Sequence, residues 1–347
     1  MNLKRLTVGT GLSLAFGLVL GLAGCGGPSS DPSTSPSSSE TALIDPNTDA
    51  SALPTDPSAS PTADEPTSEP IPVSTNLDAI TVTGGPGEAP TVTVPAPWAI
   101  DRTQTRVLDP GDGDVVPETG LIKVHYYGVN GRTGESFDDS YSRGAPADFL
   151  VDGVVVGFQR GLVGQRVGSR VLIGMPGSDG YDPDGGNANA GIEVGDSLIF
   201  VAEILEVALS GPRGSAVRPG ADLPEVSGET DHPVVTVPSG LSAPSELKIQ
   251  VLTKGTGPAI SESSLIEVNY AEYTWAGRLA RQTYGFSPVR GYLSSTIPGW
   301  QNALVGVEQG SRVLLIVPSE LAYPKGNKQI DVKAGETMVF LIDVLYA

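Results

Sequence analysis

Residues 121–126 read Leu-Ile-Lys-Val-His-Tyr, and residues 265–270 read Leu-Ile-Glu-Val-Asn-Tyr. In the first stretch Ile122, Val124 and Tyr126 alternate with their neighbours, so they share one face of an extended chain. This period of two predicts a half-buried antiparallel strand. Because the stretch recurs 144 residues later, the sequence also predicts that one structural unit is present twice.

Three further pairs of segments keep nearly the same spacing, with offsets of 143, 142 and 140: 92–95 with 235–238, 168–172 with 310–314, and 198–200 with 338–340. A unit of about 140 residues is a domain rather than a solenoid repeat, since solenoid periods are about 20–50 residues. A stretch rich in proline and glycine separates the two copies, and we expect it to be a linker.

The predicted organisation has five parts: a signal peptide at 1–24, a lipidated cysteine with a disordered tether at 25–75, a first domain at 76–210, a linker at 211–230 and a second domain at 231–347. Each copy contains one short helical candidate introduced by a glycine, at 158–163 or 300–305. Each domain is therefore predicted to be an α+β unit, in which one short helix packs on the apolar face of a sheet.

The first 25 residues have the layout of a secretory signal. Lys4 and Arg5 precede an apolar run over 6–22, and small residues stand before Cys25. Cys25 is the only cysteine of the chain, and its surroundings resemble a bacterial lipobox, in which the cysteine is acylated. We therefore expect a lipid anchor at Cys25 on the extracytoplasmic face of the cell membrane. The alternatives are an uncleaved membrane anchor and an ordinary signal peptide with a chance cysteine.

Composition narrows the range of functions. With 40 acidic and 21 basic residues the formal net charge is −19, which disfavours binding to nucleic acid. One cysteine cannot form an intramolecular disulfide and two histidines leave little for a metal site, so we expect no metal and no cofactor. Between 26 and 75, polar, acidic and proline residues predominate, which predicts a disordered tether.

Ordered motifs in the first copy carry a family resemblance: 124–128, 134–140, 155–162, 167–170 and 175–181, followed by 198–200. In this order they resemble the FKBP-type peptidyl-prolyl cis–trans isomerase family. The resemblance covers about 105–208 in the first copy and 247–346 in the second. It implies two tandem FKBP-like domains, each a bent antiparallel β-sheet wrapped around one short helix, with a shallow aromatic cradle for substrate proline.

The resemblance also implies roles for individual residues. In the first copy the implied catalytic residues are Tyr126, Asp138 and Tyr181, and the implied substrate-binding residues are Phe137, Phe149, Val154, Val155, Phe158 and Phe200. Family members usually have Trp at the position of Phe158, so we expect altered binding there. In the second copy the implied substrate-binding residues are Tyr270, Ile297, Trp300, Tyr323 and Phe340.

The second copy departs from the family pattern at one pair of positions. Aligned from Gly277, the Phe137-Asp138 pair of the first copy becomes Ala280-Arg281. A wall aromatic is lost and a carboxylate becomes a cation, so the sequence leaves activity of the second copy in doubt.

The implied chemistry needs no acid, base, metal or nucleophile. Rotation about an Xaa-Pro bond faces a barrier of ~18–20 kcal/mol because it breaks amide resonance, and a dry aromatic cradle favours the twisted amide. We expect a membrane-anchored, extracytoplasmic isomerase that assists folding of proline-containing exported polypeptides, active mainly in the first copy. Macrolide-type inhibitors are further ligands implied by the resemblance. The alternative is a non-catalytic lipoprotein that binds peptides or a ligand, or acts as a chaperone, through the same cradles.

Overall fold

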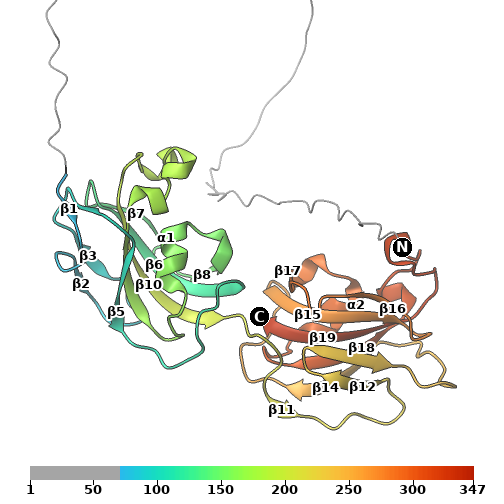
Figure 1. The fold of residues 1–347 in the computed structure, drawn as a ribbon. Helices are drawn as coiled ribbons and strands as arrows, with labels where there is room; N and C mark the ends of the chain where they lie inside the picture. The colour runs from blue at the N-terminus through green and yellow to red at the C-terminus, as the bar shows by residue number, and fades with distance from the viewer. Residues whose placement is uncertain (1–70) are drawn as a thin grey trace, which may run out of the picture. The chain divides into compact units, whose positions relative to one another are not determined.

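The computed structural model describes residues 71–347. The predicted signal peptide, Cys25 and all but the end of the predicted tether lie outside the described residues. The described part forms one sheet of six strands, one of seven strands and three sheets of two strands (Figure 1). In both larger sheets every strand pair is antiparallel, as the alternating apolar pattern predicted.

The first large sheet has the order β5-β9-β10-β6-β7, with β8 paired to β6. Its central strand β10 is buried along nearly its whole length and runs between β9 and β6. The strands of this sheet are β5 (Gln104–Asp109), β6 (Leu121–Asn130), β7 (Ser136–Asp139), β8 (Ala147–Leu150), β9 (Arg170–Met175) and β10 (Leu198–Val207).

The second large sheet repeats this topology. Its order is β11-β14-β18-β19-β15-β16, with β17 paired to β15, so only β11 has no counterpart in the first sheet. The prediction of two repeats with antiparallel sheets is therefore confirmed. The strands are β11 (Ser215–Ala216), β14 (Lys248–Lys254), β15 (Leu265–Thr274), β16 (Leu279–Gln282), β17 (Val289–Tyr292), β18 (Arg312–Val317) and β19 (Met338–Tyr346).

One short α-helix packs on a face of each sheet: α1 (Val156–Leu162) in the first repeat and α2 (Pro298–Leu304) in the second. A Cβ on Gly161 would lie 2.5 Å from Cδ1 of Ile173, so glycine allows α1 to approach β9 closely. Whether each sheet bends around its helix stays a prediction.

The helices begin two residues before the predicted positions. The glycine expected to introduce each helix, Gly157 or Gly299, is instead its second residue. In α2 the preceding Pro298 suits the first turn, since its fixed φ is already helical and its missing N–H is not needed there. Gly164 and Gly306 follow the helices with φ of +83° and +84°, a conformation that favours glycine and reverses the chain.

Short 3₁₀ turns fill the connections between these elements. They are η1 (Val151–Gly153), η2 (Gly177–Asp179), η3 (Asp182–Asp184), η4 (Ala188–Ala190), η5 (Leu293–Ser295), η6 (Ser319–Leu321) and η7 (Lys328–Ile330). Of these, η1 and η5 lead directly into α1 and α2, so the two repeats also agree in how the chain enters the helix.

The opposite face of each sheet is covered by the chain segment that precedes it, which we call the outer strap (71–100 and 223–237). The first strap contains β1 (Val73–Ser74), β2 (Thr81–Thr83), β3 (Thr91–Thr93) and β4 (Ala99–Ile100). The second contains the hairpin of β12 (Glu225–Glu229) and β13 (His232–Thr236). The first strap buries Leu77, Ile80, Trp98 and Ile100 against Val129, Leu172, Ile199 and Val201. Burial on both faces explains the apolar runs of the central strands, 198–202 in β10 and 338–342 in β19.

The straps account for the duplicated segments 92–95 and 235–238, since β3 and β13 lie at equivalent places in the two hairpins. The stretch 211–230, where we expected a linker, contains β11 and β12. The domain boundaries themselves stay a prediction.

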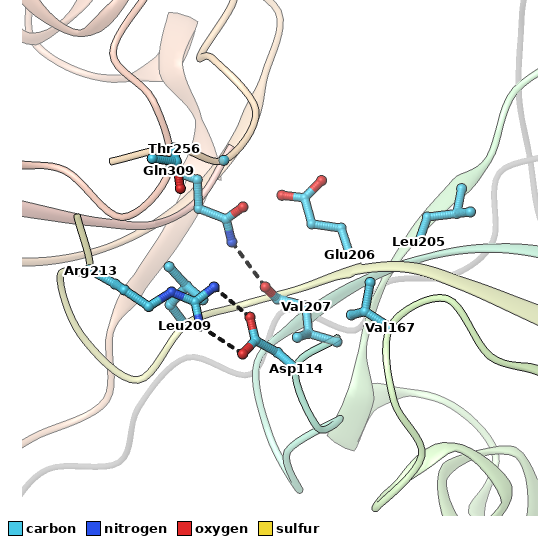
Figure 2. A pocket seen from close by; sticks show the side chains of 10 residues that line it. Asp114, Val167, Leu205, Glu206, Val207, Leu209, Arg213, Thr256 and Gln309 are labelled. Carbon is cyan, nitrogen blue, oxygen red and sulfur yellow. Dashed lines mark hydrogen bonds and ion pairs between the residues drawn. The ribbon is translucent and has the colours of Figure 1, made fainter. Parts of the chain in front are cut away.

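Both repeats lie within one compact unit, Thr67–Ala347, and several hydrogen bonds join them. The side-chain amide of Gln309 donates to the carbonyls of Val207 (2.9 Å) and Leu345 (2.8 Å), and Arg213 bonds Asp114 through two contacts of 2.7 Å. Asp114, Val207, Arg213 and Gln309 line a cavity of about 200 Å³ (Figure 2). None of the predicted cradle residues lines it.

Candidate active site

The cradle of the N-terminal repeat is a cluster of five aromatic rings contributed by five different elements. The centroids of Phe158 (α1) and Phe200 (β10) are 4.9 Å apart, and Phe137 (β7) meets Phe200 edge-on at 5.5 Å. Tyr126 (β6) lies 5.5 Å from Phe149 (β8). Tyr126, Phe158 and Phe200 are buried, whereas Phe137 and Phe149 are half-buried, so the cluster has a floor and open walls. The structure thus brings together five of the six aromatic side chains named from the sequence in this repeat, all but Tyr181.

The packing of Phe137 depends on a glycine on the neighbouring strand. A Cβ on Gly128 would lie 2.7 Å from Cζ of Phe137, closer than real Cβ atoms approach, and 3.1 Å from Phe200, which is tighter than most real contacts. Glycine at this position therefore makes room for the wall aromatic. Gly128 lies in the motif 124–128, but its role in making room for Phe137 could not be predicted from the sequence, because it arises only from the pairing of β6 with β7.

The polar edge of this cradle is a three-residue network. The hydroxyl of Tyr126 donates to Asp138 (2.5 Å), while Arg143 donates to Asp138 (2.5 Å) and to the Tyr126 hydroxyl (2.6 Å). The Arg143 guanidinium also lies 5.3 Å from the centroid of the Tyr126 ring. Burial, reinforced by the Asp138 carboxylate, raises the pKa of Tyr126 far above its usual value, so its hydroxyl stays protonated at neutral pH. Arg143 was missed in the sequence, where it is one basic residue in a polar loop.

Tyr181, Val154 and Val155 complete the predicted set. All three are half-buried and pack against the apolar core of the repeat, which includes Tyr126, Phe158 and Phe200. Burial, together with the negative charges of Asp138 and Asp184, raises the pKa of Tyr181, which therefore also keeps its phenolic proton. The cradle thus offers apolar surface and neutral hydroxyl groups rather than a general base or a nucleophile.

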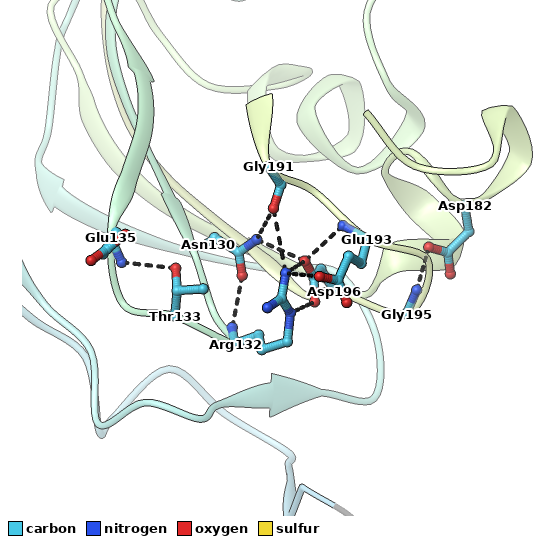
Figure 3. Close-up of polar contacts among 9 residues, drawn as sticks. All are labelled: Asn130, Arg132, Thr133, Glu135, Asp182, Gly191, Glu193, Gly195 and Asp196. Carbon is cyan, nitrogen blue, oxygen red and sulfur yellow. Dashed lines mark hydrogen bonds and ion pairs between the residues drawn. The ribbon is translucent and has the colours of Figure 1, made fainter. Parts of the chain in front are cut away.

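The loop that follows Tyr181 is held by a buried carboxylate (Figure 3). Asp196 accepts hydrogen bonds from Asn130 Nδ2 (2.7 Å), Arg132 Nε (2.7 Å) and the Glu193 amide (2.9 Å). Burial alone would raise the pKa of Asp196, but these bonds outweigh it and the net shift is downward. The network ties the end of β6 to the segment before β10, and so anchors the end of the Tyr181 loop that leads into β10.

The C-terminal repeat places its own predicted residues together. Trp300 (α2) meets Tyr270 (β15) at 5.3 Å and Phe340 (β19) at 5.7 Å, both edge-on. Ile297 and Tyr323 are half-buried against this cluster. Trp300 occupies the floor position that Phe158 has in the first repeat, since both are the third residue of their helix.

Strand pairing establishes which residues correspond in the two repeats. Glu272 stands opposite Arg281, as Gly128 stands opposite Asp138, and a bulge follows each pair at the same place. On β17, Gly291 stands opposite Ile266, where the first repeat has Phe149 opposite Ile122. The second cradle therefore lacks two wall aromatics, one at Ala280 and one at Gly291, and the sequence analysis found only the first.

Arg281 is paired with a carboxylate that the sequence analysis did not identify. Its Nη2 and Nε lie 3.1 and 3.2 Å from Oε2 of Glu272, and Nη2 also donates to the Tyr323 hydroxyl at 3.4 Å. The guanidinium lies 5.4 Å from the centroid of the Tyr270 ring. Burial raises the pKa of Glu272, and the nearby Tyr323 hydroxyl and the Arg281 charge offset this only in part.

One group of side chains in the described range has the chemistry of metal ligands. Glu229, Asp231 and His232 bring one ligand atom each within 4.8 Å of the others at the turn between β12 and β13. All three are exposed.

Known proteins resemble both repeats. The sequence pattern of a family described as FKBP-type peptidyl-prolyl cis-trans isomerase matches residues 112–205 and again residues 257–345, together more than half of the chain. A probable FK506-binding protein of Corynebacterium glutamicum is 34% identical over 95 residues, which cover 27% of this chain and 78% of the relative. An FK506-binding protein of Streptomyces anulatus is 37% identical over 99 residues, covering 28% and 79%.

A third relative and a solved structure extend the comparison. The FKBP-type peptidyl-prolyl cis-trans isomerase FkpA of Escherichia coli is 32% identical over 117 residues, covering 34% of this chain and 41% of its own. The crystal structure of the three FKBP domains of wheat FKBP73 covers 70% of this chain and 93% of its own, at 17% identity and a TM-score of 0.32. Since the family pattern recurs in both repeats, the chain belongs to the FKBP-type family and is a peptidyl-prolyl cis–trans isomerase.

Proposed function

We propose that the protein is a lipid-anchored isomerase on the extracytoplasmic face of the cell membrane, where it assists folding of exported polypeptides. Catalysis takes place mainly in the N-terminal cradle. The observation that carries this assignment is the Tyr126–Asp138–Arg143 network at the edge of five clustered aromatic rings. Cis–trans isomerisation of Xaa-Pro bonds takes tens to hundreds of seconds without a catalyst, so secreted chains benefit from one.

The geometry of the cradle supports catalysis through the apolar surroundings that it gives the substrate's Xaa-Pro amide. A prolyl ring resting on Phe158 and Phe200 would place the preceding amide in an apolar setting, where the planar form loses its solvation by water. The twisted amide has a smaller dipole and loses less solvation free energy in the cradle, so the barrier to rotation about the Xaa-Pro bond falls. In this proposal Tyr181 contacts the substrate carbonyl, and Asp138 and Arg143 hold the Tyr126 hydroxyl in place.

Activity of the full chain on a proline-containing peptide tests this function. Acceleration of isomerisation should depend on Asp138 and Phe137 in the first repeat. If the full chain does not accelerate isomerisation while it still binds proline-containing peptides, the non-catalytic alternative replaces this proposal. The absence of wall aromatics at Ala280 and Gly291 favours that alternative for the C-terminal repeat taken by itself.

The membrane location rests on the sequence of the first 25 residues. In residues 71–347 no helix combines the length and the apolar character required to cross a bilayer. The proposed attachment is through acyl chains on Cys25, which contribute about 0.8 kcal/mol per buried CH₂. The acidic and proline-rich segment after Cys25 then acts as a spacer between the membrane and the repeats.

The small-molecule ligand that we propose is based on the names of two relatives. The Corynebacterium and Streptomyces proteins are named for binding FK506. We extend this to the N-terminal cradle of the present chain, which retains the apolar surface that a macrolide-type inhibitor would cover.

A further inference from the structure

Both repeats hold an ion pair over the cradle tyrosine, but different positions supply it. In the N-terminal repeat the carboxylate comes from Asp138 and the guanidinium from Arg143, 5.3 Å from the ring of Tyr126. In the C-terminal repeat the guanidinium comes from Arg281, 5.4 Å from the ring of Tyr270. Its carboxylate partner, Glu272, stands at the position of Gly128 rather than Asp138. The feature is thus present twice. The charge is reversed at the equivalent positions Asp138 and Arg281, and the partner charge comes from positions that do not correspond, Arg143 after β7 and Glu272 in β15.

The two repeats also differ in which of two facing positions carries the larger side chain. In the N-terminal repeat Gly128 leaves space that the Phe137 ring fills, as the 2.7 Å approach to a Cβ at Gly128 shows. In the C-terminal repeat the large residue is Glu272, and its neighbour across the sheet, at the position of Phe137, is Ala280. A buried carboxylate therefore replaces the phenyl ring as part of the cradle wall.

The two ion pairs differ in what they present to a ligand. In the N-terminal pair the side chains of Asp138 and Arg143 are both accessible, at 28% and 45% exposure. In the C-terminal pair Glu272 is fully buried at 0%, whereas Arg281 is 49% exposed. Only the cation of this pair reaches the surface. In addition, Nη1 of Arg281 has no hydrogen-bond partner among residues 71–347, so its donors are available.

We propose that the C-terminal cradle binds Xaa-Pro segments in which the residue before proline is acidic, with Arg281 as the residue that determines this specificity. The inference rests on the proposed function in one respect, that the aromatic floor receives proline. Arg281 lies beside the Tyr270 ring and bonds Tyr323, so it stands at the edge of the floor formed by Trp300. A guanidinium can bond a carboxylate through two parallel N–H groups. Because Ala280 and Gly291 stand where the first repeat has aromatic residues, the cradle has room for the side chain of the acidic residue before proline.

Trp300 supplies a probe that distinguishes the two cradles. It forms the floor of the C-terminal cradle, whereas the N-terminal floor is Phe158. Trp98 packs in the first outer strap and Trp275 against the second. We would titrate the full chain at low salt with three blocked peptides, Ala-Glu-Pro-Phe, Ala-Gln-Pro-Phe and Ala-Lys-Pro-Phe, and follow tryptophan fluorescence. The signal that disappears in Trp300→Phe belongs to the C-terminal cradle.

The Glu-Pro peptide should bind with a Kd about three- to tenfold lower than that of the Gln-Pro peptide, and the Lys-Pro peptide should bind more weakly still. Arg281→Gln alone would leave Glu272 buried without its counter-ion, so the main variant is Glu272→Gln/Arg281→Gln, which removes both charges. It should keep the Trp300 signal and lose the preference for Glu-Pro. Arg143→Gln, the matched change in the other cradle, should leave the preference intact.

Equal Kd values for the three peptides, or the same preference in the double variant, would overturn the proposal. So would the lack of any Trp300-dependent signal. Failure of the proposed function is a separate result, because it is measured as isomerase activity on the same samples. Asp138→Ala should reduce that activity without changing the Trp300 titration.

Discussion

Asp138 accepts hydrogen bonds from two side chains of the N-terminal cradle, Tyr126 and Arg143. Asp138→Ala leaves both donors without this acceptor and frees the guanidinium to move. We expect kcat/KM for an Xaa-Pro peptide to fall about 10- to 100-fold, since hydrogen bonds to charged groups contribute ~1.5–3 kcal/mol. Asp152→Ala is the control, because Asp152 is an exposed carboxylate in η1 next to the same cradle. Similar losses in both variants would mean that the Asp138 network is not used.

Gly128 and Gly291 form a second matched pair of single residues. A Cβ on Gly128 meets the Phe137 ring at 2.7 Å, whereas a Cβ on Gly291 meets nothing within 4 Å. Gly128→Ala should therefore destabilise the protein by ~1–3 kcal/mol through overpacking, and Gly291→Ala should change stability by less than ~0.5 kcal/mol. Chemical denaturation followed by circular dichroism measures both. If Gly128→Ala is as well tolerated as Gly291→Ala, the wall aromatic does not need the glycine.

At the scale of elements, the Tyr181 loop depends on Asp196. The folded-state pKa of Asp196 lies below its ordinary 3.8, so its contribution to stability is present above that pH and is lost as the pH falls through the folded value. Asp196→Asn should lower the Tm by several degrees at pH 7, and the difference should narrow below about pH 4. Asp184→Asn, an exposed change in the same loop, provides the control. A pH-independent difference would show that the carboxylate charge does not hold this loop.

Elements also differ in how far the sequence predicts them. The strands and the duplication were predictable because Ile122, Val124 and Tyr126 alternate and recur at a steady offset, and the aromatic cluster because its members lie in recognisable motifs. Contacts that depend on strand pairing were not predictable: Gly128 with Phe137, or Glu272 with Arg281. The outer straps were missed as well, since short apolar residues among Pro, Gly and Thr look like a loop until the sheet they cover is known. The catalytic and binding roles of the predicted residues stay predictions.

For the whole molecule, the proposed attachment to the membrane requires one atom, the sulfur of Cys25. Cys25→Ser should release the protein into the extracytoplasmic medium or leave the signal peptide uncut, because no other cysteine can be acylated. Cell fractionation and metabolic labelling with a fatty acid measure this. Ala23→Gly, which keeps a small residue before the cysteine, should remain labelled and membrane-bound. A Cys25→Ser protein that is still labelled and bound would show that the lipobox interpretation is wrong.

The central claim for the whole chain is that catalysis lies mainly in the N-terminal cradle, and kcat/KM of full-length variants on one Xaa-Pro peptide tests it most directly. Phe137→Ala/Asp138→Arg gives the first repeat the residues that the second has at these positions. A loss of ~2–3 kcal/mol of transition-state binding predicts that kcat/KM falls roughly 30- to 150-fold. Trp300→Phe, which gives the second floor the ring of the first, should change the rate by less than about twofold. Circular dichroism confirms that both variants are folded. Only the first variant should show the large loss. Equal losses, or a large loss only in Trp300→Phe, would mean that catalysis does not lie mainly in the N-terminal cradle.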